Sequence, residues 1–181
     1  MYRTVQDFLE DWQASAAGTL KVMKAITDDK MDVAIVEDHN SLGWLAWHLV
    51  GVAGGIGHFA GLQIPAPGPE MAQPDHMADI VDAYEQVMDA YTNQAVTLTD
   101  AMLVEEVPAF GGQMLRGKLL RLLIDHQTHH RGQMTVLLRQ ADEKMLKNEV
   151  LGDDKVKELL AGKEIVKVII IPGRMANIVV K

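Results

Sequence analysis

Four stretches of the chain repeat apolar residues with a period near 3.6, and this pattern constrains the fold more than any other sequence feature. Each stretch is roughly 20 residues long, the length of a helix and not of a strand. Cap-forming residues precede the second stretch, and two proline- and glycine-containing connectors separate the last three. The predicted helices cover 5–26, about 42–60, about 77–98 and 114–141. Four such amphipathic helices predict a mainly α fold, a four-helix bundle.

Composition changes sharply near Glu143. Residues 1–142 carry a net charge of −10 and all seven histidines, whereas residues 143–181 carry a net charge of +2 and no histidine. We therefore predict two domains, the bundle over 1–142 and a small C-terminal α+β extension over 143–181.

The extension is predicted to contain one short helix and a β-hairpin. The helix covers about 153–160, and β-branched strands cover 164–171 and 175–180 on either side of the turn residues Pro172 and Gly173. An isolated hairpin is only marginally stable in water, and its open edges invite pairing. We expect it to pack against the bundle or to pair with a neighbouring chain, giving a homodimer.

Composition also excludes several classes of function. The chain has no cysteine, so it has no disulfide, no thiolate metal site and no cysteine nucleophile. A net charge of −8 argues against a broad nucleic-acid surface and against binding to anionic lipid. No signal-peptide core and no membrane-spanning apolar run is present in the sequence, so a cytoplasmic protein is expected.

The most informative polar residues are His126 and His130 in the fourth predicted helix. A separation of four residues places both imidazoles within roughly 40° on one helix face. That face also carries Leu119, Leu123 and Leu137, so the pair is predicted to point into the core. Two imidazoles aimed together into an apolar interior are half of a metal site.

His48, in the second predicted helix, is the candidate third ligand. It shares an apolar stripe with Leu45 and Val52, so its ring is also predicted to face the interior. The alternative is that these histidines are neutral, hydrogen-bonded core residues. Each buried imidazole needs a polar partner, however, and one divalent cation shared by His48, His126 and His130 would satisfy all three.

Three neighbours of the pair have weaker roles. His129 could replace His130 as a ligand, although it is expected at the flank of the helix. Asp125 and Gln133 could orient a ligating ring from behind, or could be ordinary polar residues of the helix.

Three neutral imidazoles leave a cation its full charge and at least one open coordination position. Such an ion can lower the pKa of bound water toward ~7 or ionise a bound thiol. Zinc suits this donor set best, with nickel, iron, copper or manganese as alternatives. Because the chain has no cysteine, any reacting sulfur would come from a small thiol cosubstrate. No residue pair identifies a general base, so the catalytic residues are not assigned.

Two segments, residues 40–50 and 125–140, resemble the signature segments of the DinB/YfiT-like family. The stretch from Phe110 to Leu120 is also similar to that family, and the resemblance covers residues 2–142. Members are four-helix bundles that bind a divalent metal through one histidine of the second helix and a His-x-x-x-His pair of the fourth. The resemblance thus implies the ligands His48, His126 and His130. Related branches include transferases and isomerases that use small thiol cofactors.

The tail resembles a different family. Residues 154–180 look like the extreme C-terminus of bacterial leucyl-tRNA synthetases, where they form part of a small domain that contacts tRNA. The net charge of the extension is only +2, so nucleic acid is not the expected partner.

Three functional hypotheses follow. The first is a divalent-metal enzyme of transferase or hydrolase type that acts on a small molecule. The second is a non-catalytic binding module whose bundle is braced by the metal. The third is an RNA-associated protein that binds through its tail.

Overall fold

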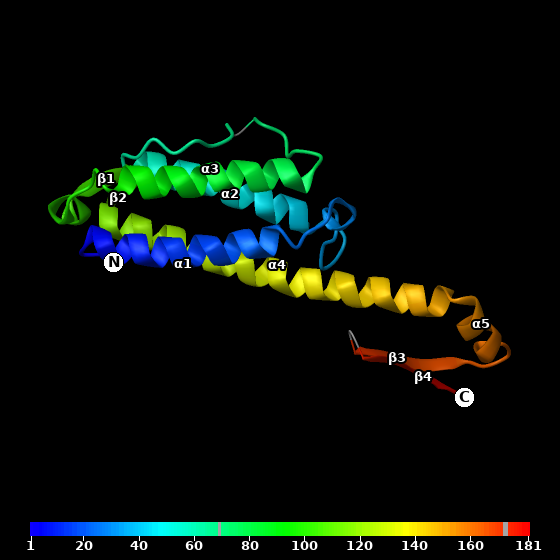
Figure 1. Cartoon of the computed structure of the whole chain (residues 1–181). Coiled ribbons are helices and arrows are strands. Elements are labelled where there is room, and N and C mark those ends of the chain that lie inside the picture. The colour runs from blue at the N-terminus through cyan, green and yellow to red at the C-terminus, as the bar shows by residue number, and fades with distance from the viewer. Residues whose placement is uncertain (69, 172–173) are drawn as a thin grey trace. The chain divides into compact units, whose positions relative to one another are not determined.

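The computed structural model describes residues 1–68, 70–171 and 174–181 (Figure 1). The predicted turn at Pro172 and Gly173 therefore lies outside the described residues. The described chain forms two compact units, Met1–Thr135 and Val136–Lys181, and each is treated by itself below.

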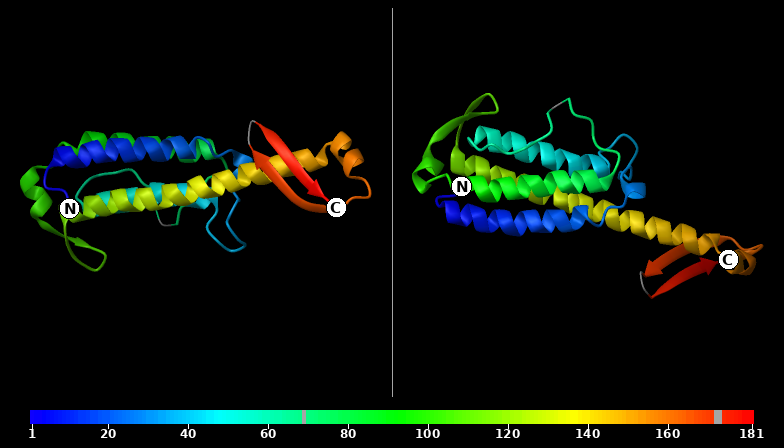
Figure 2. Two further views of the ribbon diagram at one scale, coloured as in Figure 1. Left: turned by 90° about the horizontal axis from the view of Figure 1, so that it is seen from below. Right: turned by 45° about the horizontal axis from the view of Figure 1, so that its top comes forward.

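The predicted mainly helical fold is confirmed. In the first unit, three helices run alongside the first part of a fourth (Figures 1 and 2). The four helices are α1 (Val5–Met23), α2 (Leu42–Phe59), α3 (Met77–Ala95) and α4 (Arg116–Gly152). Two short 3-10 helices lie in the connections, η1 (Asp28–Lys30) and η2 (Asp100–Val104). None of the described helices combines the length and the apolar content that a bilayer crossing needs.

Helix α4 is longer than predicted. The prediction ended it at residue 141, but the helix continues to Gly152. Residues 142–151 contain no glycine or proline and are mostly good helix formers, so the change in composition does not interrupt the backbone. The composition change near Glu143 thus falls inside α4, and the domain boundary proposed there stays a prediction.

A small hairpin occupies the predicted connector between α3 and α4. Strand β1 (Glu106–Ala109) pairs antiparallel with β2 (Gly112–Leu115). The two-residue turn has positive φ at both positions, 50° at Phe110 and 77° at Gly111. Such a turn usually has asparagine, aspartate or glycine at both positions, and a phenylalanine there is uncommon. The sequence therefore carried little signal for this hairpin.

The core of the bundle centres on aromatic residues of α1 and α3. Trp12 and Tyr91 are fully buried, and their ring centroids lie 4.4 Å apart. Phe8 packs edge-on against Tyr91 at 6.1 Å. The Tyr91 hydroxyl donates a 2.7 Å hydrogen bond to the Ala53 carbonyl, which ties α3 to α2.

The second unit contains the rest of α4, a short helix and the predicted β-hairpin. Helix α5 (Asp154–Leu160) is capped by Asp153, whose side chain accepts hydrogen bonds from the backbone of the first turn. Strand β3 (Ile165–Ile171) pairs antiparallel with β4 (Met175–Val180). None of the described residues of β3 and β4 is buried, although most are valine or isoleucine.

We expect this exposed hairpin to mediate self-association. Ile169 is 38% exposed and lies opposite Asn177 in the register. Pairing would bury only the exposed part of Ile169, which contributes about 0.6–1.1 kcal/mol per chain, so Ile169→Lys in both chains should raise a dimer dissociation constant about tenfold. Sedimentation equilibrium would measure it. The control Asn148→Lys adds the same charge at an exposed polar position of α4, outside the hairpin, and should leave the assembly intact. A wild-type protein that is monomeric at all concentrations would contradict the expectation.

Candidate metal centre

Helices α2 and α4 bring three predicted residues together: His48, His126 and His130. The Nε2 atom of His126 lies 3.4 Å from that of His48 and 3.2 Å from that of His130. One ring nitrogen from each residue lies within 4.8 Å of the other two. In a tetrahedral site with metal–nitrogen bonds of 2.0–2.1 Å, the nitrogens are roughly 3.3–3.4 Å apart. The three histidines are therefore compatible with binding one divalent ion.

The start of each helix is held by local contacts. Helix α2 begins after Ser41, whose hydroxyl accepts a hydrogen bond from the Trp44 amide. Helix α4 begins at Arg116, which donates to the Met102 carbonyl at 3.2 Å and to Glu105 at 3.1 Å. The Ser41 cap fixes the residue at which α2 begins, and Arg116 ties the start of α4 to η2.

The rotation of α4 is held by polar contacts on its other faces. Gln127 is fully buried, and its Oε1 accepts a 2.8 Å hydrogen bond from the Tyr84 hydroxyl of α3. Arg131 donates to the Ser15 carbonyl of α1 at 2.7 Å. Because these residues alternate with the histidines along α4, binding them to α1 and α3 turns the histidines toward α2.

Gln133 lies where the sequence predicted a partner for a ligating ring. Its Oε1 is 2.6 Å from Nδ1 of His130. An amide oxygen only accepts, so Nδ1 carries the proton and Nε2 presents its lone pair to the other two rings. A metal-ligating histidine generally has such a partner on its second nitrogen.

The other predicted neighbours lie outside the group of three. The Asp125 carboxylate pairs with Arg121, at 2.7 Å from Nη2 and 2.9 Å from Nε, because the two residues are one turn apart on the exposed face. The ring of His129 lies 4.8 Å from that of His130 and the residue is exposed.

Sequence reasoning missed the role of Trp44. Its indole stacks on the His48 ring at a centroid distance of 4.6 Å and an interplanar angle of 13°. The signal was present, since an aromatic residue four positions before a histidine shares its helix face. By this stacking Trp44 covers one side of the His48 ring, while the indole itself is 40% exposed.

The sequence had suggested that the three rings lie deep in the core. In the structure all three are only half-buried. Burial, together with the neighbouring His130 and His48, lowers the pKa of His126 from 6.5 to about 4. The pKa values of His48 and His130 are also lowered, again mainly by burial. All three imidazoles are therefore neutral at pH 7, the form that binds a metal.

We expect the metal-free protein to lose stability as the pH falls from 6.5 toward 4. The pKa of His126 is 6.5 when unfolded and about 4 when folded, so in this range the unfolded state binds more protons. Its contribution to stability is complete above pH 6.5 and is lost as the pH falls through this window. NMR titration of the His126 ring and urea unfolding at several pH values would measure both effects. His126→Gln should make the free energy of unfolding depend less on pH. Titration of the His126 ring near pH 6.5 in the folded protein would contradict the prediction.

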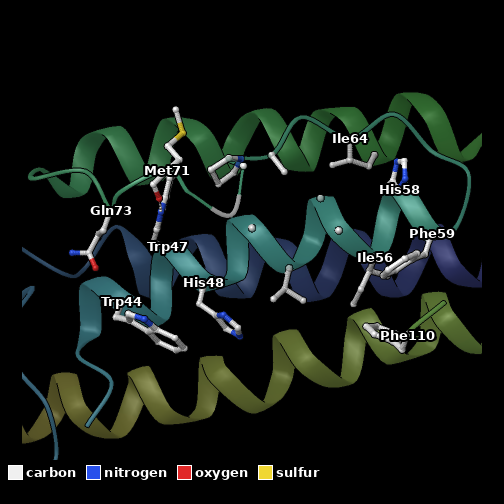
Figure 3. Close-up of a pocket in the computed structure, with 17 residues that line it drawn as sticks. Trp44, Trp47, His48, Ile56, His58, Phe59, Ile64, Met71, Gln73 and Phe110 are labelled. Carbon is white, nitrogen blue, oxygen red and sulfur yellow. Dashed lines mark hydrogen bonds between the residues drawn. The ribbon is translucent and has the colours of Figure 1, made fainter. Parts of the chain in front are cut away.

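A groove of about 850 Å³ opens beside His48 (Figure 3). Trp44 and His48 line one end, and Phe59 and Phe110 line the other. None of the described residues that line it is a lysine, arginine, aspartate or glutamate. One candidate ligand, His48, therefore lines a largely apolar cavity that could hold a small molecule.

Comparison with known proteins gives two kinds of similarity. The sequence profile of the DinB family matches residues 1–155. Protein YrdA of Bacillus subtilis is 39% identical over 142 residues, which are 78% of this chain and 85% of that protein. The crystal structure of a DinB-like protein from Bacillus cereus superposes with a TM-score of 0.73 at 35% identity, covering 78% of this chain and 95% of that one.

The second similarity is to leucine–tRNA ligases. The ligase of Corynebacterium glutamicum is 34% identical over 82 residues, which are 45% of this chain. This match is longer than the extension 143–181, so the similarity is not confined to the tail. The chain spans only 8% of the ligase, a small part of that enzyme.

Proposed function

Because the chain belongs to the DinB family, we propose that it is a metal-dependent enzyme that acts on a small molecule at the three-histidine site. The observation that carries the proposal is the convergence of the Nε2 atoms of His48, His126 and His130, with separations of 3.4 and 3.2 Å from His126. A cytoplasmic location is part of the same proposal.

The residues present fit a divalent ion. The donors are three neutral imidazole nitrogens, the set that zinc commonly takes, and nickel, iron or manganese are the alternatives. His130 is held with its Nε2 lone pair toward the other rings by Gln133. When bound, the ion supplies Lewis-acid chemistry, lowering the pKa of a water or thiol that it binds.

The number of ligands favours an enzyme over a metal-braced binding module. Among the described residues, the candidate group holds three histidines and no carboxylate. Structural zinc sites are usually closed by four protein ligands, whereas catalytic sites have three and an open position. We propose a transferase or hydrolase, and, because the chain lacks cysteine, a small thiol cosubstrate for any reaction of sulfur.

The residues around the site would then have distinct tasks. Gln133 orients the His130 ring, and Trp44 stacks on His48 and limits its rotation. The uncharged groove beside His48 keeps water from the apolar part of a bound molecule.

The test is metal content followed by a reaction screen. Protein purified without chelator should contain about one divalent ion per chain by mass spectrometry. The Mn²⁺-loaded form should enhance the relaxation of solvent protons, because an open position holds exchangeable water. The zinc-loaded protein would then be screened with small thiols and electrophilic acceptors, and with esters and amides. A bound ion without exchangeable water would favour the metal-braced module and count against an enzyme.

We expect no binding of tRNA at about 0.15 M salt. Affinity for nucleic acid depends on neutralising phosphates, and the extension has a net charge of only +2 beside a bundle with −10. Fluorescence anisotropy of labelled bulk tRNA would measure it, with a basic RNA-binding protein as the positive control. Binding at this salt concentration would support the RNA-associated hypothesis instead.

A further inference from the structure

The groove follows one face of α2. Trp44, His48, Gly55 and Phe59 share this face, because separations of four, seven and eleven residues return to nearly the same helical angle. All four residues line the groove, and Figure 3 labels Trp44, His48 and Phe59. At 1.5 Å per residue, the groove extends roughly 16 Å from His48 to Phe59. Its volume of about 850 Å³ lies within the range of small-molecule sites.

Gly55 forms an open part of the groove floor. A Cβ atom added there would meet nothing within 4 Å, whereas one added at Gly54 or Gly57 would collide with Ala66 or Ile64 of the following loop. Glycine inside a helix costs about 1 kcal/mol relative to alanine. Close packing explains that cost at Gly54 and Gly57 but not at Gly55. The missing side chain at Gly55 leaves room beside His48.

Two aromatic residues close the far end. Phe110, at the tip of the β1–β2 hairpin, is 61% exposed, and its ring lies 5.1 Å from that of Phe59. Its φ of 50° is in the left-handed region, which L-residues with large side chains avoid. A positive φ is unfavourable for phenylalanine, and such strained residues cluster at functional sites. The exposed Phe110 ring therefore indicates a contact surface for an apolar group.

The polarity of the groove defines its occupant. At one end is His48, one of the three candidate metal ligands. Beyond it, the described lining contains no charged side chain and is largely aliphatic and aromatic. A charged group would lose its hydration there without a partner, and an apolar group would not.

We propose that the groove binds the uncharged, apolar tail of an amphiphilic small molecule whose metal-binding head lies at the three-histidine site. This inference rests on the proposed function and specifies its substrate class: a molecule with an alkyl, acyl or aryl tail that extends from His48 over Gly55 toward Phe59 and Phe110.

The experiment compares two hydroxamic acids with the same metal-binding head. Acetohydroxamic acid has almost no tail, and octanohydroxamic acid has a long one. Each fully buried methylene strengthens binding about fourfold, so the longer compound should bind zinc-loaded protein at least about 100-fold more tightly. Isothermal titration calorimetry measures both affinities, and the emission of Trp44 and Trp47, which line the groove, reports the position of the tail.

Gly55→Leu fills the floor of the groove. It should remove most of the gain from the long tail while leaving zinc content and the affinity for acetohydroxamic acid unchanged, and Gly55→Ala should give an intermediate loss. The matched control is Gly152→Leu, because Gly152 is also an exposed helical glycine with nothing within 4 Å of an added Cβ, and it does not line the groove.

The outcomes separate the two proposals. Equal affinities of the wild-type protein for both hydroxamic acids would overturn the inference and leave the metal site in place. A full gain from the tail in Gly55→Leu would also overturn it, because the tail would then lie elsewhere. Failure of the zinc-loaded protein to bind acetohydroxamic acid would contradict the proposed function itself.

Discussion

Replacing His126 with alanine should strip the bound metal from the purified protein. His126 is the central ligand candidate, since its Nε2 lies 3.4 Å from that of His48 and 3.2 Å from that of His130. Removing the hydrogen-bond partner of a ligating histidine weakens metal binding about 10–100-fold. Removing the histidine itself should therefore weaken metal binding more than about 100-fold. Mass spectrometry should then find less than about 0.1 ion per chain, and a competing chelator would give the affinity.

Two further variants test the geometry. His129→Ala removes the exposed neighbouring histidine, which lies outside the group of three, and should keep its metal. Gln133→Ala leaves the His130 ring without its partner and should weaken binding by about 10–100-fold. Full metal occupancy in the double variant His48→Ala, His126→Ala would remove the basis of the proposed site.

Leu123→Ala should destabilise the protein by about 2–5 kcal/mol, because it leaves a cavity in a close-packed core. Leu123 is fully buried on α4, three residues before His126. The adjacent Leu122 is 37% exposed, so Leu122→Ala makes the same chemical change with an expected cost of about 1 kcal/mol or less. Urea unfolding of the metal-free variants, with unchanged m-values, would measure the difference. An equal loss of stability in Leu123→Ala and Leu122→Ala would mean that α4 is rotated away from the observed orientation. The histidines of α4 would then be rotated as well.

The parts of the site that could be predicted are those set by one helix at a time. A four-residue separation places His126 and His130 on one face whatever surrounds the helix. The apolar stripe around His48 likewise predicts which face of α2 is turned inward. The three rings share a site because these two faces meet in a bundle. Helical period and fold class were therefore sufficient to select the candidate ligands.

The remaining features depend on contacts between segments. The depth of the rings depends on how neighbouring helices cover them, and they are half-buried where the sequence suggested a core. Asp125 pairs with Arg121, because the exposed face of α4 that carries it also carries an arginine one turn away. The β1–β2 hairpin that carries Phe110 has an unusual turn residue and hence a weak local signal. The groove is formed by α2, the loop that follows it and Phe110 of the hairpin, so its shape depends on how the loop folds back onto the helix, which no helical pattern describes.

The close approach of three ring nitrogens also bears on the life of the protein in a cell. A ligand that binds only the folded chain stabilises it, by about 2.7 kcal/mol at a free concentration 100 times its dissociation constant. Quality-control proteases degrade chains in proportion to the time they spend unfolded. If the folded bundle alone assembles the three nitrogens, metal starvation would shorten its half-life, and abundance would follow metal supply without any change in transcription.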